Sequence, residues 1–376
     1  MFVFVCAECG AELTTPLSQV VLPAHAHQSY GNGTQLPVLM ESGTFAVDPE
    51  PSGPPWRTWE EIGPEEAAAR GVYAPDHPVP GGAPGAIVLA PGDAPGTRLI
   101  PEHGGGGYCC GLGRADGPNV ACVACRLPVA TRIDDCSLWQ ALWLVPDAVR
   151  RLPVDGADAT PRSWARVMAE GVSTPPFEAM AGWGSRTRVA HWTNHWWSWS
   201  PRWQAAVGQA LAHLLAASEG RPVTVPDGLA GEVFRPALDA LLPPGPGARR
   251  AALAGPGLPD PEPDADILLV PAHPQTGETW TPPPGPAREA YRVPLAFGVW
   301  RGLVLPERGR PVPASGGLPE GVLRDDYDPS ASRPRPPFQA DGRAFRHAMV
   351  RIPAVRGPWL RELMGDGARL SGAGFF

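Results

Sequence analysis

Two short cysteine pairs constrain the fold of this chain more than any other feature of its sequence. Cys6 and Cys9 form a Cys-x-x-Cys pair at the start of the chain, and Cys122 and Cys125 form a second pair much later. A Cys-x-x-Cys turn directs both sulfurs to one side of a tight knuckle, so two knuckles offer four thiolates to one tetrahedral metal ion. The sequence therefore predicts one metal site with these four ligands, closed by the tertiary structure across a long insertion.

The residues around each pair support this interpretation. Phe2–Val5 is a run of apolar β-formers, which predicts a strand leading into the first knuckle, and Gly10 suits the sharp turn that follows it. Phe2–Gly10 and residues 119–126 resemble the knuckles of zinc ribbons, and this resemblance implies a structural Zn²⁺ site and no activity. Arg126 departs from the pattern, since a glycine often stands there. Iron would use the same four sulfurs, as in rubredoxin-like sites, so the sequence does not separate the two metals.

Three further cysteines are left outside this site. Cys109, Cys110 and Cys136 lie between His103 and Trp143, together with the second knuckle. His103, Cys109, Cys110 and Cys136 are the candidate ligands of a second metal site. The alternative is that Cys136 and one of the adjacent pair are small buried apolar side chains.

Two catalytic interpretations of these cysteines are weak. The first is that Cys136 is a catalytic nucleophile. Asp134 and Asp135 precede it, and two nearby carboxylates would raise the pKa of its thiol, whereas an active nucleophile needs a lowered pKa. Zinc-dependent nucleobase deaminases require His-x-Glu and Pro-Cys-x-x-Cys motifs. Here Ala121 precedes Cys122 and no His-x-Glu occurs, which excludes that class.

The composition predicts the fold class and excludes several chemistries. The 376 residues include 45 glycines and 50 prolines, which predicts a loop-rich α+β protein with short strands and helices. All 31 basic residues are arginines, because the sequence contains no lysine. Schiff-base enzymes, kinases and ordinary P-loop nucleotide-binding proteins all need a lysine, so we expect none of these functions.

Charge and hydropathy bear on partners and location. The net charge of −7 makes a nucleic-acid partner unlikely for the chain as a whole. Residues 331–376 carry eight arginines and three acidic residues. This basic segment is expected either to dock on the acidic rest of the protein, or to form a surface patch that binds an acidic partner or an anion. No run of 18 apolar residues and no signal peptide are visible, so we expect no membrane span. Paired cysteines of this kind indicate a reducing cytoplasm.

The chain divides into four expected regions. Residues 1–146 form a zinc-ribbon-like α+β domain, 147–242 a tryptophan-rich helical region, 243–265 a Pro/Gly-rich connector, and 266–376 a β-rich region with a basic end. Ser200-Pro201 predicts a helix start, and apolar residues then recur at helical spacing as far as Gly220.

Several histidines and tryptophans are weaker candidates for a site. His25 and His27 would face the same side of a strand, or belong to a polar turn ended by Asn32-Gly33. His-x-x-x-His would place two imidazoles on one helix face, although a metalloprotease needs glutamate after the first histidine, where Trp192 stands. His273 is a further candidate, because it follows the apolar run Ile267–Val270, which predicts a buried strand. In chain order the five candidate histidines are His25, His27, His191, His195 and His273.

These features support three hypotheses about function. The first is a zinc-stapled, non-enzymatic scaffold or protein-interaction protein whose tryptophans or basic end contact an unknown protein partner. The second is a metal-dependent hydrolase that uses a second site built from the histidines with Asp134 or Asp135. The third is a nucleic-acid-binding zinc ribbon. If the tryptophans of residues 192–203 are exposed, they offer the surface for a partner that the first hypothesis needs. If they are buried, their role is to pack the core.

Overall fold

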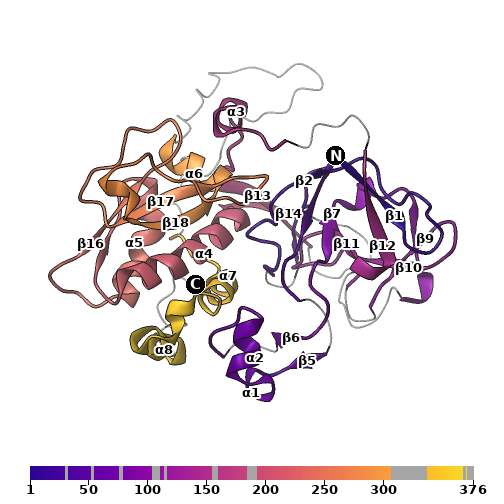
Figure 1. Ribbon diagram of the computed structural model, residues 1–376, viewed down its shortest axis with the longest axis horizontal. Helices are drawn as coiled ribbons and strands as arrows, with labels where there is room; N and C mark the ends of the chain where they lie inside the picture. The colour runs from indigo at the N-terminus through magenta and orange to yellow at the C-terminus, as the bar shows by residue number, and fades with distance from the viewer. Residues whose placement is uncertain are drawn as a thin grey trace.

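Short strands and helices joined by loops make up most of the described part of the chain, as the glycine and proline content predicts. A computed structural model describes residues 1–29, 33–51, 55–75, 79–103, 111–113, 117–154, 160–183, 193–305, 337–366 and 370. It confirms an α+β fold with two units side by side, a β-rich N-terminal unit and a C-terminal unit of helices around a parallel sheet (Figure 1). No helix among these residues is long and apolar enough to cross a membrane.

A seven-stranded sheet forms the body of the N-terminal unit. Its strand order is β2-β4-β7-β11-β10-β9-β8, and every neighbouring pair is antiparallel except β2 and β4. The strands are β2 (Ser18–Gln19), β4 (Thr44–Val47), β7 (Ile87–Leu89), β8 (Thr97–Leu99), β9 (Val120–Cys122), β10 (Pro128–Ile133) and β11 (Ala141–Leu144). A two-stranded ribbon of β1 (Phe2–Cys6) and β12 (Val149–Pro153) packs beside it. The predicted strand before the first knuckle is therefore confirmed.

Both faces of this sheet are covered by apolar side chains. Val88 and Trp143 belong to the core on one face, whereas Leu89 and Leu142 belong to the core on the other. Strands alternate their side chains between faces, so two cores explain why all four residues of β11 are buried. Trp139 and Trp143 are both buried core residues of this unit, and Trp143 lies in β11.

The C-terminal unit is built on a parallel sheet of order β15-β16-β17-β18. Its strands are β15 (Val223–Thr224), β16 (Arg249–Leu253), β17 (Ile267–Ala272) and β18 (Tyr291–Ala296). β16 lies within the stretch expected to be a connector, residues 243–265, and pairs with strands on both sides. The stretch after residue 266 contributes two strands and then three helices, α6 (Phe297–Val304), α7 (Gly342–Met349) and α8 (Pro358–Gly365).

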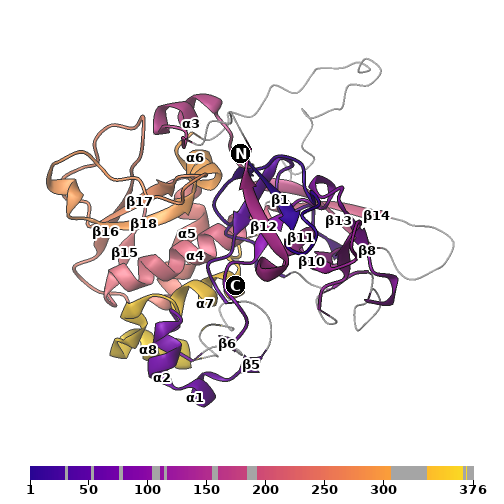
Figure 2. The ribbon, with the colours of Figure 1, turned by 45° about the vertical axis from the view of Figure 1, so that its right-hand side comes forward.

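Two long helices, α4 (Pro201–Ser218) and α5 (Leu229–Leu241), supply much of the core of this unit. α4 begins and ends where the sequence predicts, with Ser200 at the N-cap, Pro201 in the first turn and a left-handed Glu219-Gly220 end. The Ser200 hydroxyl bonds the Glu178 carboxylate instead of capping the helix backbone. α7 lies along α4 in both views (Figures 1 and 2).

The remaining elements connect or cover these two units. A hairpin of β13 (Phe177–Trp183) and β14 (Thr193–Trp199) pairs with β3 (Thr34–Gln35), so N-terminal and middle segments share one sheet. The small helices α1 (Trp59–Ile62) and α2 (Pro64–Ala69) bury Ile62 and Ala67 in the core of the C-terminal unit and lie near α8 (Figure 2). The fold also contains a two-stranded sheet of β5 (Trp56–Arg57) and β6 (Val79–Pro80), and the helix α3 (Trp164–Glu170).

Candidate metal centre

The first knuckle is a tight turn at the end of β1. The Cys6 carbonyl accepts a hydrogen bond from the Gly10 N–H at 3.0 Å, and the Cys6 N–H donates to the Ala11 carbonyl at 2.8 Å. Gly10 has a φ of 74°, in the left-handed region that glycine adopts without steric cost. The chain then returns beside β1, where the Leu13 N–H donates to the Phe4 carbonyl. This return fixes Cys9 on the same side as Cys6.

The second knuckle repeats these backbone contacts. It joins β9 to β10, with the Arg126 N–H donating to the Cys122 carbonyl at 3.0 Å and the Cys122 N–H donating to the Leu127 carbonyl at 2.9 Å. Arg126 takes a φ of 70°, the conformation that Gly10 has in the first knuckle. The departure from the glycine pattern therefore leaves the turn geometry intact, with an arginine held in the left-handed region.

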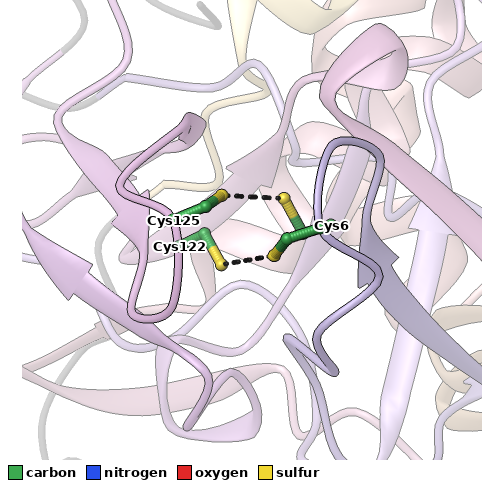
Figure 3. A group of neighbouring side chains, drawn as sticks. Cys6, Cys122 and Cys125 are labelled. Atoms are coloured by element: carbon green, nitrogen blue, oxygen red, sulfur yellow. Dashed lines mark hydrogen bonds between the residues drawn. The ribbon is translucent and has the colours of Figure 1, made fainter.

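The two knuckles face one another and bring all four sulfurs together (Figure 3). Cys6 Sγ lies 3.5 Å from Cys125 Sγ, and Cys9 Sγ lies 3.8 Å from Cys122 Sγ. The four sulfurs lie within 4.8 Å of one another. A tetrahedron with Zn–S bonds of about 2.3 Å has edges of roughly 3.8 Å, so the observed separations fit a four-thiolate metal site.

Burial divides the four ligands into two pairs. Cys6 and Cys122 are fully buried within the core of the N-terminal unit, whereas Cys9 and Cys125 are exposed. The inner sulfurs are thus fixed by packing around Phe4 and Leu142. The outer sulfurs depend on the knuckle backbone for their position. One edge of the site therefore faces the solvent.

The thiols strongly influence each other's ionisation. Burial raises the pKa of Cys6, but hydrogen bonds from the backbone of Cys9 and Glu8 and from neighbouring thiols outweigh it and lower that pKa to about 7. The backbone of Leu127 lowers the pKa of Cys125, but partial desolvation of its sulfur and hydrogen bonds with the other three thiols outweigh it and raise that pKa to about 12. Of the thiol protons in this group, the first is therefore lost readily and the last is lost with difficulty. A divalent cation at the centre would remove this repulsion, since a coordinating thiol is deprotonated outright.

The proposed second metal site is only partly within the described residues. Cys109 and Cys110 lie outside them. His103 is exposed and its Nδ1 lies 2.8 Å from the Pro118 carbonyl oxygen, whereas Cys136 is buried. Among the residues that the structure describes, only the four-cysteine group brings three or more potential ligands close enough to hold an ion.

The candidate histidines whose side chains the structure describes, His25, His27 and His273, do not form a common group of metal ligands. His25 is buried against Trp139, with ring centroids 4.3 Å apart. His195 lies on β14, so the helical His-x-x-x-His hypothesis is wrong for the described part, and His191 and Trp192 lie outside it. His273 is at the end of β17 as expected. Its Nε2 lies 2.8 Å from the Arg162 carbonyl and its Nδ1 accepts from the backbone N–H of Gln275 and Thr276, which makes it a structural tie between segments.

The carboxylates expected beside these histidines are also elsewhere. Asp134 pairs with Arg132 at 3.1 Å, and Asp135 accepts a hydrogen bond from the Cys136 N–H at 2.9 Å. Trp199 and Trp203, at the end of the tryptophan-rich segment, are fully buried core residues. For these two tryptophans the structural role is confirmed.

Sequence reasoning missed one polar cluster altogether. His27 pairs with Asp48, and His347 pairs with Glu50, which also binds Arg351. The histidine and carboxylate of the second pair lie almost three hundred positions apart in the chain. No motif or spacing in the sequence indicates either pair, and the packing of α7 against the N-terminal unit creates the contact of His347 with Glu50.

No protein-family profile, curated protein or solved structure matches this chain. The fold and the site therefore define it as an α+β protein with a four-cysteine group able to bind a metal ion.

Proposed function

We propose that this chain is a zinc-stapled scaffold or binding protein in which Zn²⁺ has a structural role. The observation that carries the proposal is the closed set of four thiolates supplied by two equivalent knuckles. Catalytic zinc sites keep an open coordination position and usually have histidine or carboxylate ligands. Four cysteines fill a tetrahedral site, so Cys6, Cys9, Cys122 and Cys125 would hold the ion and leave no position for a substrate.

The place of the site in the fold explains what a staple would stabilise. β1 pairs only with β12 and with the returning residues 12–17, and the second knuckle belongs to the seven-stranded sheet. A metal ion between the knuckles would join the ribbon to the sheet at their shared core. A reducing compartment such as the cytoplasm would keep these thiolates available for the ion.

Elemental analysis of purified protein tests this proposal. We expect one equivalent of zinc in the native chain, loss of that zinc in Cys9→Ser, and full retention in the matched control Cys136→Ser. Loss of the zinc should also lower the midpoint of thermal unfolding, because metal binding to the folded state stabilises it. A metal-free native protein, or iron in place of zinc with the absorption bands of an iron–thiolate centre, would contradict the assignment of zinc.

A further inference from the structure

A cleft of about 2270 Å³ lies where the N-terminal unit meets the C-terminal unit. One wall comes from residues 25–29 and 48–50 of the N-terminal unit, and the facing wall includes α7. Gln28 joins these walls directly, because its Nε2 donates to the Pro201 carbonyl at 3.2 Å and to Asp341 at 3.0 Å. The polar groups on either side of this junction are therefore held in a defined arrangement.

Two histidine–carboxylate pairs face each other across this junction. His27 Nε2 lies 3.0 Å from Asp48 Oδ2, and His347 Nε2 lies 2.9 Å from Glu50 Oε2. The two imidazole rings lie 5.7 Å apart between centroids. Each carboxylate accepts the Nε2 hydrogen and thereby orients its ring. Among the described residues neither Nδ1 has a hydrogen-bond partner, so both Nδ1 atoms are available to a ligand.

α7 adds two guanidinium groups to the same wall. Arg343, Arg346 and His347 recur at the i, i+3 and i+4 positions of one helix face, opposite the buried Phe345 and Met349. Arg343 bonds only the neutral hydroxyl of Ser29, and no ion pair of Arg346 is found in the described part of the chain. Both cations line the cleft, and neither has a carboxylate partner among the described residues.

The carboxylates of this wall are engaged by other groups. Asp48 pairs with His27, and Glu50 pairs with His347 and Arg351. Asp341 accepts hydrogen bonds from the Ala344 N–H and from Gln28 Nε2. Burial would raise the pKa of Glu50, but His347, Arg351 and His27 outweigh it and lower that pKa, so the carboxylate stays charged. The guanidinium groups of Arg343 and Arg346 are therefore left to bind an anion.

We propose that this wall of the cleft binds a phosphate dianion, free or as the terminal group of a small phosphorylated molecule. The guanidinium groups of Arg343 and Arg346 donate its hydrogen bonds, and the imidazoles of His27 and His347 line the same wall. Charge-assisted bonds from arginine to phosphate oxygens are short and strong. This site is independent of the zinc staple.

Sulfate is the first probe, because it keeps two negative charges at every pH used. Calorimetric titration of the zinc-loaded protein at pH 7 should show saturable sulfate binding. Arg346→Gln should weaken this binding by about tenfold or more, because it removes a charge-assisted hydrogen bond. Arg166→Gln, on the far wall of the same cleft and largely exposed, is the matched control and should leave affinity unchanged.

A second set of titrations separates the sources of phosphate. Inorganic phosphate should bind under the same conditions, and glycerol 3-phosphate should compete with sulfate whereas glycerol should not. Arg343→Gln serves as an independent variant if Arg346→Gln lowers the unfolding midpoint. Absence of sulfate binding to the native chain, or equal binding by Arg346→Gln and the native chain, would overturn the proposal. Zinc content of each variant shows separately whether the metal site is intact.

Discussion

Gly10 and Arg126 occupy the same position in two knuckles and share the same left-handed backbone, with φ of 74° and 70°. Each donates its N–H to the carbonyl of the first cysteine of its pair at 3.0 Å. Glycine adopts this conformation freely, whereas a side chain there crowds the backbone at a cost of roughly 1–2 kcal/mol. The hydrogen bonds of the knuckle, and not the residue type, maintain the turn at Arg126.

Replacing this arginine by glycine should therefore stabilise the protein. We expect Arg126→Gly to raise the free energy of unfolding by about 0.5–1 kcal/mol, less than the full strain because glycine also gains entropy in the unfolded chain. Urea unfolding of the zinc-loaded protein measures this. Arg126→Ala is the control, since it removes the exposed guanidinium but keeps the Cβ. A gain of equal size in both variants would show that the charge, and not the backbone, was unfavourable.

Gly208 should be intolerant of a methyl group at the contact between α4 and α7. A Cβ at this position would lie 2.5 Å from the Asp341 carbonyl oxygen and 3.2 Å from the Phe345 nitrogen. Alanine is the better helix former by about 1 kcal/mol, but the overlap is with backbone and cannot be relieved by a rotamer change. We expect Gly208→Ala to cost about 1–3 kcal/mol in net unfolding free energy. Gly245→Ala, where the space is open, should change stability by less than about 0.5 kcal/mol.

Gln28 should stabilise the junction between the two units. Besides its two donated bonds, its Oε1 accepts from Trp139 Nε1 at 3.3 Å, and the side chain is buried. Gln28→Ala would leave the buried indole N–H without a partner and should cost about 2–4 kcal/mol. Gln19→Ala is the control, because Gln19 is exposed and makes a single bond to Arg151. Equal small losses in both variants, measured by urea unfolding, would show that the junction contributes little.

Acid should destabilise the protein through His25. Burial, and then the charge of Arg202, lower the pKa of His25 to about 3. Because the unfolded chain binds this proton at higher pH than the folded chain, stability is complete above the unfolded pKa and falls as pH decreases toward the folded value. Between pH 7 and pH 5 this histidine should account for a loss of about 2 kcal/mol.

Urea unfolding of the native chain and of His25→Asn at both pH values measures this contribution. Asparagine does not titrate, so the drop between pH 7 and pH 5 should be smaller by about 2 kcal/mol in the variant. His213, whose pKa burial also lowers, titrates in the same direction in both proteins and cancels in the comparison. An identical drop in the two proteins would contradict the assignment of the effect to His25.

Local patterns in the sequence were sufficient for several parts of the fold. The β-former run before Cys6, the Ser200-Pro201 start of α4 and the four metal ligands all depend on residues that are neighbours in the chain or on a motif with fixed spacing. The α+β class follows from composition and from the short apolar runs between prolines and glycines. These features are local, so each can be read from a few consecutive residues.

The tertiary structure decided what long-range packing creates. It placed His195 on a strand, although the His-x-x-x-His spacing suits a helix, because β14 pairs with β13 and β13 pairs in turn with the distant β3. It placed β16 in a stretch whose proline and glycine content predicts a connector. It also brought His347 to Glu50 through the docking of α7 on the N-terminal unit, next to the His27–Asp48 pair within that unit. The sequence by itself determined the local turns and the ligands of the metal centre, whereas the cleft exists only because two units fold against each other.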